Sequence, residues 1–419
     1  MKHTAYHGNF IDTEEPGQFT AHPDSYLRVN EDGVIEGFAD FPDPSDEVAE
    51  LGKGLVIPAY TDLHLHSSQL PMTGLGCDGT VEEWFDSYCH PTEQAYENEE
   101  YADRVNRALV SELVRYGSLH VVIMSSVSKK ATENLYRHLC DAGIGAFLGK
   151  MNSDFAESGK AEETTEDSLD ETRQLAEEFV GNPEVSYIIS PEYIPTCSEA
   201  LLFGLGRLAG EQRLPVQSHM NEGDFDTKIV AERFPGEQSY ANVWEKYGLF
   251  GQTKTVMAHC TCTPERDLEW MAEKGVFLAY CPDAIVHIPS GDYLSVKDCM
   301  DLGISMGLGS DIGGGHTLDM RQVLVNAVFV SKVNGYTPHL TLSEAFYLAT
   351  KGGGAFFGNT GSFERGFFFD ALVIDDARLC RFREYAAAER LARYLYSGTW
   401  DMIKDRYYHG RQILPKEDV

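Results

Sequence analysis

Short apolar runs that alternate with helical patterns constrain the fold of this chain more than any other feature. Each run has the length of one buried strand, and a longer segment with helical spacing of its apolar side chains follows it. The eight runs are Leu55–Tyr60, Leu119–Met124, Ile144–Leu148, Val185–Ile189, Pro215–Gln217, Thr255–Ala258, Val276–Tyr280 and Ile304–Leu308. Eight βα units predict a closed (β/α)8 TIM barrel around a parallel sheet. An open doubly wound sheet is the alternative, but no G-x-G-x-x-G motif follows an early strand, which disfavours it.

The segments between the runs contain the expected helices. These include Tyr101–Tyr116, Thr164–Val180, Glu199–Gln212, Pro264–Lys274 and Leu318–Lys332. Thr164 and Thr263 look like residues that precede a helix, and we expect Pro264 at the first helical position of its helix.

The two ends of the chain differ from its middle. Strand-like patches separated by turn residues fill the first 54 residues, and strand-like patterns return in Ala371–Ile374 and Tyr407–Leu414. We therefore predict that residues 1–54 and 362–419 together build a small β-sandwich domain. Residues 55–361 form the barrel between them.

Charge and cysteine content limit the partners and the compartment. The chain has 34 basic and 66 acidic side chains, a net charge of −32, which repels nucleic acids and anionic membrane surfaces. No window approaches the roughly 18 apolar residues of a membrane helix, and the polar start does not resemble a signal peptide. Nine scattered cysteines without a C-x-x-C pair are typical of reduced thiols. We expect a cytoplasmic protein with neither nucleic acid nor membrane as a partner.

The segment Asp62–His66 carries the strongest chemical signal. His64 and His66 are two residues apart directly after the first apolar run, so in an extended segment both imidazoles point the same way. Imidazole is a good ligand for zinc or iron. Alone, this His-x-His pattern is as compatible with an ordinary loop as with a metal site.

Three further polar residues follow predicted strands. His219, His259 and Asp311 each come at the end of an apolar run. Barrel enzymes keep their active sites at the carboxyl ends of the strands, so five such residues together indicate a metal centre. Glu222 lies three residues after His219, where a carboxylate near a metal-activated water can take up its proton and deliver it to a substrate.

The chain resembles the metal-dependent amidohydrolase superfamily over nearly its whole length. The resemblance rests on Pro58–Gln69, Ser218–Glu222, Met257–Cys260, Cys281–Asp283 and Gly307–Gly315. Gln69 after His-Ser-Ser, Glu-Glu-Trp at 82–84 and His-Pro at 90–91 are similar to the guanine deaminase branch in particular.

The resemblance implies a role for each of these residues. His64, His66, His219 and Asp311 would hold one zinc ion per subunit, with Fe2+ as the alternative metal. His259 would be either a further ligand or a hydrogen-bonding partner of the bound water. Glu222 would carry a proton from the attacking water to the ring and then to the departing amine, and Asp311 would also accept a proton.

The same resemblance implies the substrate and its contacts. Guanine would be converted to xanthine and ammonia by a homodimeric enzyme of purine metabolism. Gln69 would hydrogen-bond an edge of the bicyclic base, and Glu192, Tyr193 and His219 would also contact it.

One residue departs from the pattern of this branch. Guanine deaminases carry an arginine after the fourth strand that faces the purine carbonyl, and Glu192 occupies the matching position here. A carboxylate that faces a carbonyl leaves two acceptors without a donor. Either Glu192 points away from the base, or the substrate presents N–H groups there. The second case favours another aminated heterocycle, such as a pterin, 8-oxoguanine or another aminopurine.

Two other functions fit the sequence less well. A barrel retained only as a scaffold predicts loss of the metal-binding positions, and all of them are present. A two-metal hydrolase of cyclic amides or phosphoesters is expected to have a bridging lysine on the fourth strand, where this chain has Ile188-Ile189-Ser190.

Overall fold

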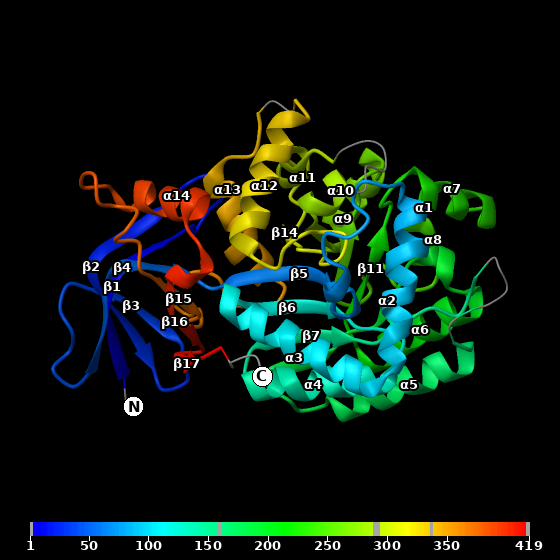
Figure 1. Ribbon diagram of the computed structural model, residues 1–419, viewed down its shortest axis with the longest axis horizontal. Helices are drawn as coiled ribbons and strands as arrows, with labels where there is room; N and C mark the ends of the chain where they lie inside the picture. The colour runs from blue at the N-terminus through cyan, green and yellow to red at the C-terminus, as the bar shows by residue number, and fades with distance from the viewer. Residues whose placement is uncertain (1–2, 157–160, 162, 288–293, 336–337, 416–419) are drawn as a thin grey trace.

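The computed structural model of the chain describes residues 3–156, 161, 163–287, 294–335 and 338–415. The ends of the two predicted β segments, residues 1–2 and 416–419, therefore lie outside the described part. Figure 1 shows a β-rich part that contains the N-terminal strands and the last strands, next to a larger part in which helices surround strands.

Among the described residues, eight parallel strands lie at the centre of the larger part. They are β5 (Tyr60–His66), β6 (Ser118–Met124), β7 (Gly145–Gly149), β9 (Val185–Tyr187), β11 (Val216–Met220), β12 (Thr255–His259), β13 (Phe277–Tyr280) and β14 (Met306–Leu308). They pair in the orders β5-β6-β7-β9 and β11-β12-β13-β14. A bridge between Ile189 and Val216 joins the two sets, and the Asp311 amide donates to the His64 carbonyl at 2.8 Å on the other side. The predicted (β/α)8 barrel is confirmed.

Helices and short strands occupy the connections of the barrel. The helices are α1 (Val81–Trp84), α2 (His90–Gln94), α3 (Glu99–Tyr116), α4 (Lys129–Ala142), α5 (Thr165–Glu178), α6 (Glu199–Gln212), α7 (Asp224–Arg233), α8 (Tyr240–Lys246), α9 (Glu265–Lys274), α10 (Pro282–His287), α11 (Val296–Asp301), α12 (Met320–Val333) and α13 (Leu342–Tyr347). Two short strands, β8 (Met151–Asn152) and β10 (Ser190–Pro191), pair beyond the barrel strands.

Local side-chain chemistry explains the helix starts. The Thr164 hydroxyl accepts the Asp167 amide at 3.1 Å and caps α5. Pro264 does not begin α9 as we predicted. Its backbone is extended, with ψ 146°, so it is the residue before the helix, and its carbonyl accepts the Asp267 amide at 2.9 Å.

The small β domain is one hydrogen-bonded sheet that combines both ends of the chain. Its order is β17-β16-β15-β4-β1-β2-β3. The N-terminal strands are β1 (His3–Asp12), β2 (Thr20–Asn30), β3 (Ile35–Ala39) and β4 (Glu47–Pro58). The C-terminal strands are β15 (Ala371–Ile374), β16 (Ile403–Tyr408) and β17 (Arg411–Ile413), and α14 (Ala387–Ser397) lies between the first two of them in the chain.

The first apolar run does not form a barrel strand as we predicted. Leu55–Pro58 ends β4 and pairs antiparallel with Ala371–Ile374 of the small domain. The first barrel strand is β5, which begins at Tyr60. Both histidines of the His-x-His pattern therefore lie on the strand itself.

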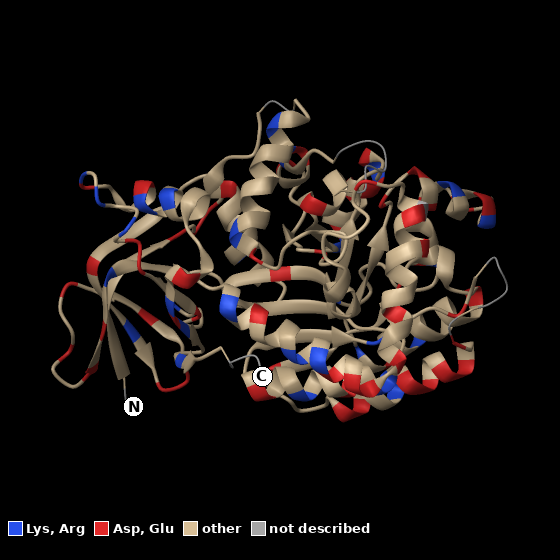
Figure 2. Cartoon of the chain, viewed as in Figure 1, with Lys and Arg blue, Asp and Glu red and all other residues tan. Residues whose placement is uncertain are grey.

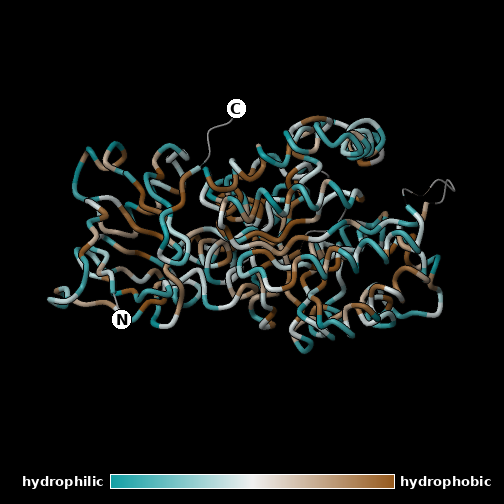
Figure 3. The backbone as a smooth tube through the Cα atoms, turned by 90° about the horizontal axis from the view of Figure 1, so that it is seen from below, coloured by the Kyte–Doolittle hydropathy of each residue, from teal (hydrophilic) through white to brown (hydrophobic). Residues whose placement is uncertain are grey.

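The core lies inside the barrel and between its strands and helices. Side chains such as Leu63, Val122, Ile188 and Val256 fill the barrel interior together with Phe356. Figure 3 shows that hydrophobic residues are concentrated along the central strands. Figure 2 shows acidic residues gathered on the outer helices, including α5. None of the described helices has the length and apolarity that a bilayer-spanning segment needs.

Candidate active site

The barrel places the five predicted metal-binding residues around one point at the carboxyl ends of its strands. His64 and His66 end β5, His219 lies on β11, His259 is the last residue of β12, and Asp311 follows β14. Their ligand atoms form two overlapping groups that share His64, with all atoms of each group within 4.8 Å of one another. Up to 247 positions separate these residues in the chain, yet all five are buried in one cluster.

Unusual backbone conformations direct two of these side chains. His259 has φ 68° and Asp311 has φ 48°, and Asn221 and Cys260 beside the cluster are also left-handed. Non-glycine residues adopt this region at a cost, and such residues gather at functional sites. The left-handed conformations at the strand ends therefore direct the side chains of His259 and Asp311 toward the opening of the barrel.

The spacing of the ligand atoms fits a single metal ion. The Nε2 atoms of His66 and His219 are 3.0 Å apart, and Asp311 Oδ1 lies 3.4 Å from His64 Nε2 and 3.6 Å from His66 Nε2. Ligands about 2.0–2.1 Å from a tetrahedral zinc ion are roughly 3.3 Å from one another. Among the described residues, His64 Nε2 has no hydrogen-bond partner although it is buried. The donor set therefore fits a cation at the centre.

Neighbouring groups keep the imidazoles in the form that binds metal. His219 Nδ1 donates to the Glu192 carbonyl at 2.5 Å, which leaves its Nε2 lone pair toward the centre. Burial lowers the pKa of His64 and His66 well below the usual value and also lowers the pKa of His219 and His259. All four rings are thus neutral near pH 7.

A second buried carboxylate ties the strand ends together. Asp62 Oδ1 accepts the Ser310 amide at 2.9 Å and the His64 amide at 3.2 Å. It therefore connects the strand that carries His64 to the loop that carries Asp311. Burial raises the pKa of Asp62 to about 7.

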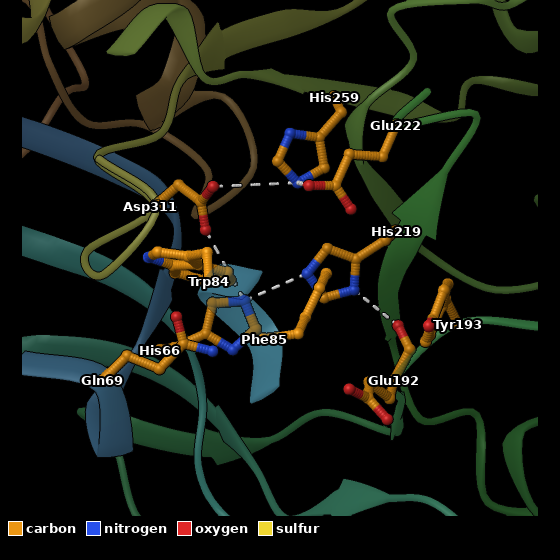
Figure 4. A pocket seen from close by; sticks show the side chains of 11 residues that line it. His66, Gln69, Trp84, Phe85, Glu192, Tyr193, His219, Glu222, His259 and Asp311 are labelled. Atoms are coloured by element: carbon orange, nitrogen blue, oxygen red, sulfur yellow. Dashed lines mark hydrogen bonds and ion pairs between the residues drawn. The ribbon is translucent and has the colours of Figure 1, made fainter. Parts of the chain in front are cut away.

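Glu222 lies beside the cluster, in the turn between β11 and α7. Its Oε1 is 4.0 Å from His259 Nε2, whose distance to Asp311 Oδ2 is 3.9 Å. Asp226 holds this turn by accepting the amides of Glu222 and Gly223 at 3.3 and 3.0 Å. Burial raises the pKa of Glu222 to about 8. Figure 4 shows its carboxylate directed between Asp311 and His219.

A cavity opens next to the cluster. Figure 4 shows its walls. They consist of His66, Gln69, Trp84, Phe85, Glu192, Tyr193, His219, Glu222, His259, Asp311 and Gly314. All the residues predicted to contact the substrate thus line the same cavity.

A glutamate fixes the orientation of Gln69. The Gln69 amide nitrogen donates to Glu93 Oε1 at 3.0 Å, so its oxygen remains as an acceptor. Gly313, with φ 108°, passes close by, and a Cβ atom there would lie 2.5 Å from that oxygen. Gln69 is therefore held as an acceptor at the cavity wall.

Glu192 lies directly after β10, at the end of the cavity away from His259 in Figure 4. Burial raises the pKa of Glu192, and Thr196 and Ser153 oppose this shift in part. Within the described part of the chain, no lysine or arginine lines this cavity. Tyr193 is the next wall residue, and its ring is 6.4 Å from that of His219.

The segment between β5 and α3 contributes two cavity residues that their spacing alone does not assign to the site. Trp84 and Phe85 recur near helical spacing, which is typical of core or interface residues, but both line the cavity. Trp84 is also packed against Met72 and Cys89. Aromatic residues in a core and aromatic residues that line a cavity show the same helical spacing, so the spacing does not distinguish the two. The side chain of Glu82 in the same motif lies outside the described residues.

Comparison with known proteins is consistent with this site. The model of the amidohydrolase family matches residues 55–399. The guanine deaminase of Dictyostelium discoideum is 29% identical over 97% of this chain and 97% of its own length. The human guanine deaminase is 30% identical over 86% of this chain and 83% of its own. The crystal structure of guanine deaminase from C. acetobutylicum with bound guanine is 34% identical, with a TM-score of 0.94 over 99% of this chain and 100% of that one.

Proposed function

This chain belongs to the amidohydrolase family, and on that premise we propose that it hydrolyses guanine to xanthine and ammonia. The observation that carries the proposal is the meeting of four histidines, Asp311 and Glu222 at one end of the barrel, beside a cavity that three of these histidines line. Several guanine deaminases align over most of the chain, and one of them holds guanine in its active site.

Zinc is the cofactor that this donor set fits best. His64, His66, His219 and Asp311 would hold one ion per subunit, since imidazole and carboxylate are zinc ligands at the spacings found here. Fe2+ is the alternative, because imidazole also suits iron. When bound, the ion supplies a nucleophilic water near neutral pH. His259 would complete the set as a ligand or hydrogen-bond the attacking water.

Glu222 is the residue that transfers protons in the proposed reaction. Its carboxylate faces the cluster from the turn after β11 and is fixed there through Asp226. We infer that it takes one proton from the attacking water and delivers it to a ring nitrogen. Asp311 would accept the second proton of the water, and Glu222 would then carry that proton to the leaving amine. Water adds one oxygen to the ring carbon, and the ring loses its amino group as ammonia.

The cavity walls would orient the base. The Gln69 oxygen accepts an N–H group of the base, because its amide nitrogen is already engaged with Glu93. Trp84, Phe85 and Tyr193 offer aromatic surface to the faces of a planar ring.

Glu192 favours a second candidate substrate. A carboxylate accepts hydrogen bonds only, and no cationic side chain among the described wall residues balances it. A 2-aminopurine that carries an amino group in place of the guanine carbonyl would donate to Glu192. The compound 2,6-diaminopurine has this arrangement and almost the shape of guanine, so it separates the two candidates.

Initial rates on a set of bases test the proposal. We expect the zinc-loaded enzyme to release one ammonia per guanine consumed and to form xanthine. Guanine, 2,6-diaminopurine, 8-oxoguanine and pterin are compared at equal concentrations. A guanine rate no higher than that of the buffer refutes guanine as the substrate, and a higher kcat/KM on another base identifies the alternative.

We also propose that the enzyme acts in purine metabolism in the cytoplasm as a homodimer. The free state of all nine cysteines supports a reducing compartment. The dimer follows from the family resemblance, and light scattering of the purified protein tests it. A single species with the 46.7 kDa mass of one chain would contradict it.

A further inference from the structure

A second group of metal-binding side chains lies at the opposite end of the barrel from the active site. It consists of His120, Asp370 and His409, whose ligand atoms are all within 4.8 Å of one another. His120 lies near the start of β6, Asp370 directly precedes β15, and His409 lies in the turn between β16 and β17. The group therefore joins the floor of the barrel to the small β domain.

The spacing in this group suits two ligands of one ion better than a hydrogen bond. His120 Nε2 and Asp370 Oδ2 are 3.4 Å apart. An N–H···O hydrogen bond is typically about 2.7–3.2 Å long. Ligands of one tetrahedral zinc ion are roughly 3.3 Å apart. The distance equals the 3.4 Å between His64 Nε2 and Asp311 Oδ1 in the active site.

Neither neutral tautomer of His120 finds good hydrogen-bond partners for both ring nitrogens among the described residues. The ring is fully buried, and its Nδ1 atom has no hydrogen-bond partner among the described residues. With the proton on Nε2, the bond to Asp370 is long and the Nδ1 lone pair is unused. With the proton on Nδ1, the Nε2 lone pair faces a carboxylate oxygen. A cation between Nε2 and Oδ2 removes this repulsion.

A bound cation would also compensate the negative charge of the buried Asp370 carboxylate. Its carboxylate is buried and accepts the Thr360 hydroxyl and the His409 amide, both at 2.6 Å. The nearby Arg411 guanidinium instead pairs with Glu184 at 3.0 Å. Among the described residues, no lysine or arginine makes an ion pair with Asp370, and a buried carboxylate without a cation in direct contact is costly.

The rest of the pocket holds the ligands in place. The His409 ring is stacked against Phe368 and Tyr408, with ring centroids 3.9 and 4.1 Å apart. Next to His120, the chain has Gly145, where a Cβ atom would lie 2.9 Å from His120 Cδ2. The glycine leaves the room that the imidazole occupies.

We propose that His120, Asp370 and His409 bind a second divalent transition metal ion, separate from the catalytic one. Two imidazoles and a carboxylate select zinc or a similar ion, because magnesium and calcium prefer oxygen ligands only. The ion fastens β6 of the barrel to the C-terminal strands of the small domain. Its role is structural, since the group lies at the far end of the barrel from Glu222.

Metal analysis of the full-length enzyme and its His409→Gly variant tests this site. His409 has φ 48°, a conformation that glycine adopts without strain, so the turn is expected to remain intact. After equilibration with zinc and removal of unbound metal, we expect two ions per chain in the wild type and one in the variant. The matched control is Asp24→Gly, a left-handed residue of the same domain that lies outside the group, which should keep both ions.

A second measurement follows stability and activity. Zinc at about 100 times its Kd should raise the Tm of the wild type by roughly 3 °C more than that of His409→Gly. Guanine turnover of the catalytically loaded variant should be unchanged, which keeps this test independent of the proposed activity. One ion per wild-type chain, or equal metal content in wild type and His409→Gly, would overturn the second site.

Discussion

Replacing Glu192 with glutamine probes the chemistry of the cavity directly. The change keeps the size of the side chain but converts an acceptor-only carboxylate into an amide with an N–H donor. In the orientation that the family resemblance implies, this side chain faces position 6 of the purine. Glu192→Gln should therefore shift preference from 2,6-diaminopurine toward guanine.

The magnitude follows from the hydrogen bonds exchanged. The amino group of 2,6-diaminopurine loses a charge-assisted bond to Glu192, which contributes about 1.5–3 kcal/mol. The guanine carbonyl gains a neutral bond, which contributes about 0.5–1.5 kcal/mol. Together these change the ratio of the two kcat/KM values by about 2–4.5 kcal/mol, or roughly 30- to 2,000-fold. We expect the lower end, since the new amide oxygen can still accept from the amino group.

The assay measures kcat/KM for both bases by ammonia release in the wild type and the variant. The ratio of the two values does not depend on the fraction of active enzyme. Glu232→Gln is the matched control, because it removes the same charge from an exposed position on α7. A change in the ratio of less than about threefold, below ~0.7 kcal/mol, would show that Glu192 does not contact the base.

Three further predictions address catalysis, packing and pH. Glu222→Gln should keep its metal but lower kcat by about 10²–10⁴-fold because the proton carrier is lost, and steady-state rates with metal analysis check this. Gly206→Ala on α6 should lower the unfolding free energy by about 3 kcal/mol or more, because its Cβ would lie 1.6 Å from the Tyr247 carbonyl. Gly210→Ala on the same helix meets nothing within 4 Å and should stabilise by about 0.5–1 kcal/mol in the same urea titration. Burial raises the pKa of Asp283 to about 6, so its contribution to stability is present below pH 4 and is lost as the pH rises through 6. Asp283→Asn should therefore be more stable than the wild type by about 2 kcal/mol at pH 8 but not at pH 4, and equal differences at both pH values would contradict this.

The barrel was predictable because its signal is local. Each buried strand is a short apolar run, and each helix has a 3.6-residue period, so both patterns are visible within one segment. The two errors occurred where a segment borders two structures. Leu55–Pro58 has the composition of a barrel strand, but pairing with β15 assigns it to the small domain. Pro264 suits both the first helical turn and the residue before it.

The clustering of the proposed metal-binding residues was predictable for a related reason. A parallel barrel brings the carboxyl ends of all its strands together, so His219, His259 and Asp311 could be placed near His64 from order alone. The cavity walls lack such a rule. Trp84 and Phe85 reach the site through a helical segment between β5 and α3, and nothing in their spacing indicates which way they face.

The sequence by itself determined the architecture and the identity of the chemical groups, because strand and helix periods and strand-end residues are properties of single segments. Only the tertiary structure decided where Glu192 lies, that Glu93 holds Gln69 as an acceptor, and that His120 and His409 meet at Asp370. Those relations join segments up to 289 positions apart in the chain. They depend on packing across the barrel and on distances of a few tenths of an ångström, which no local pattern of residues contains.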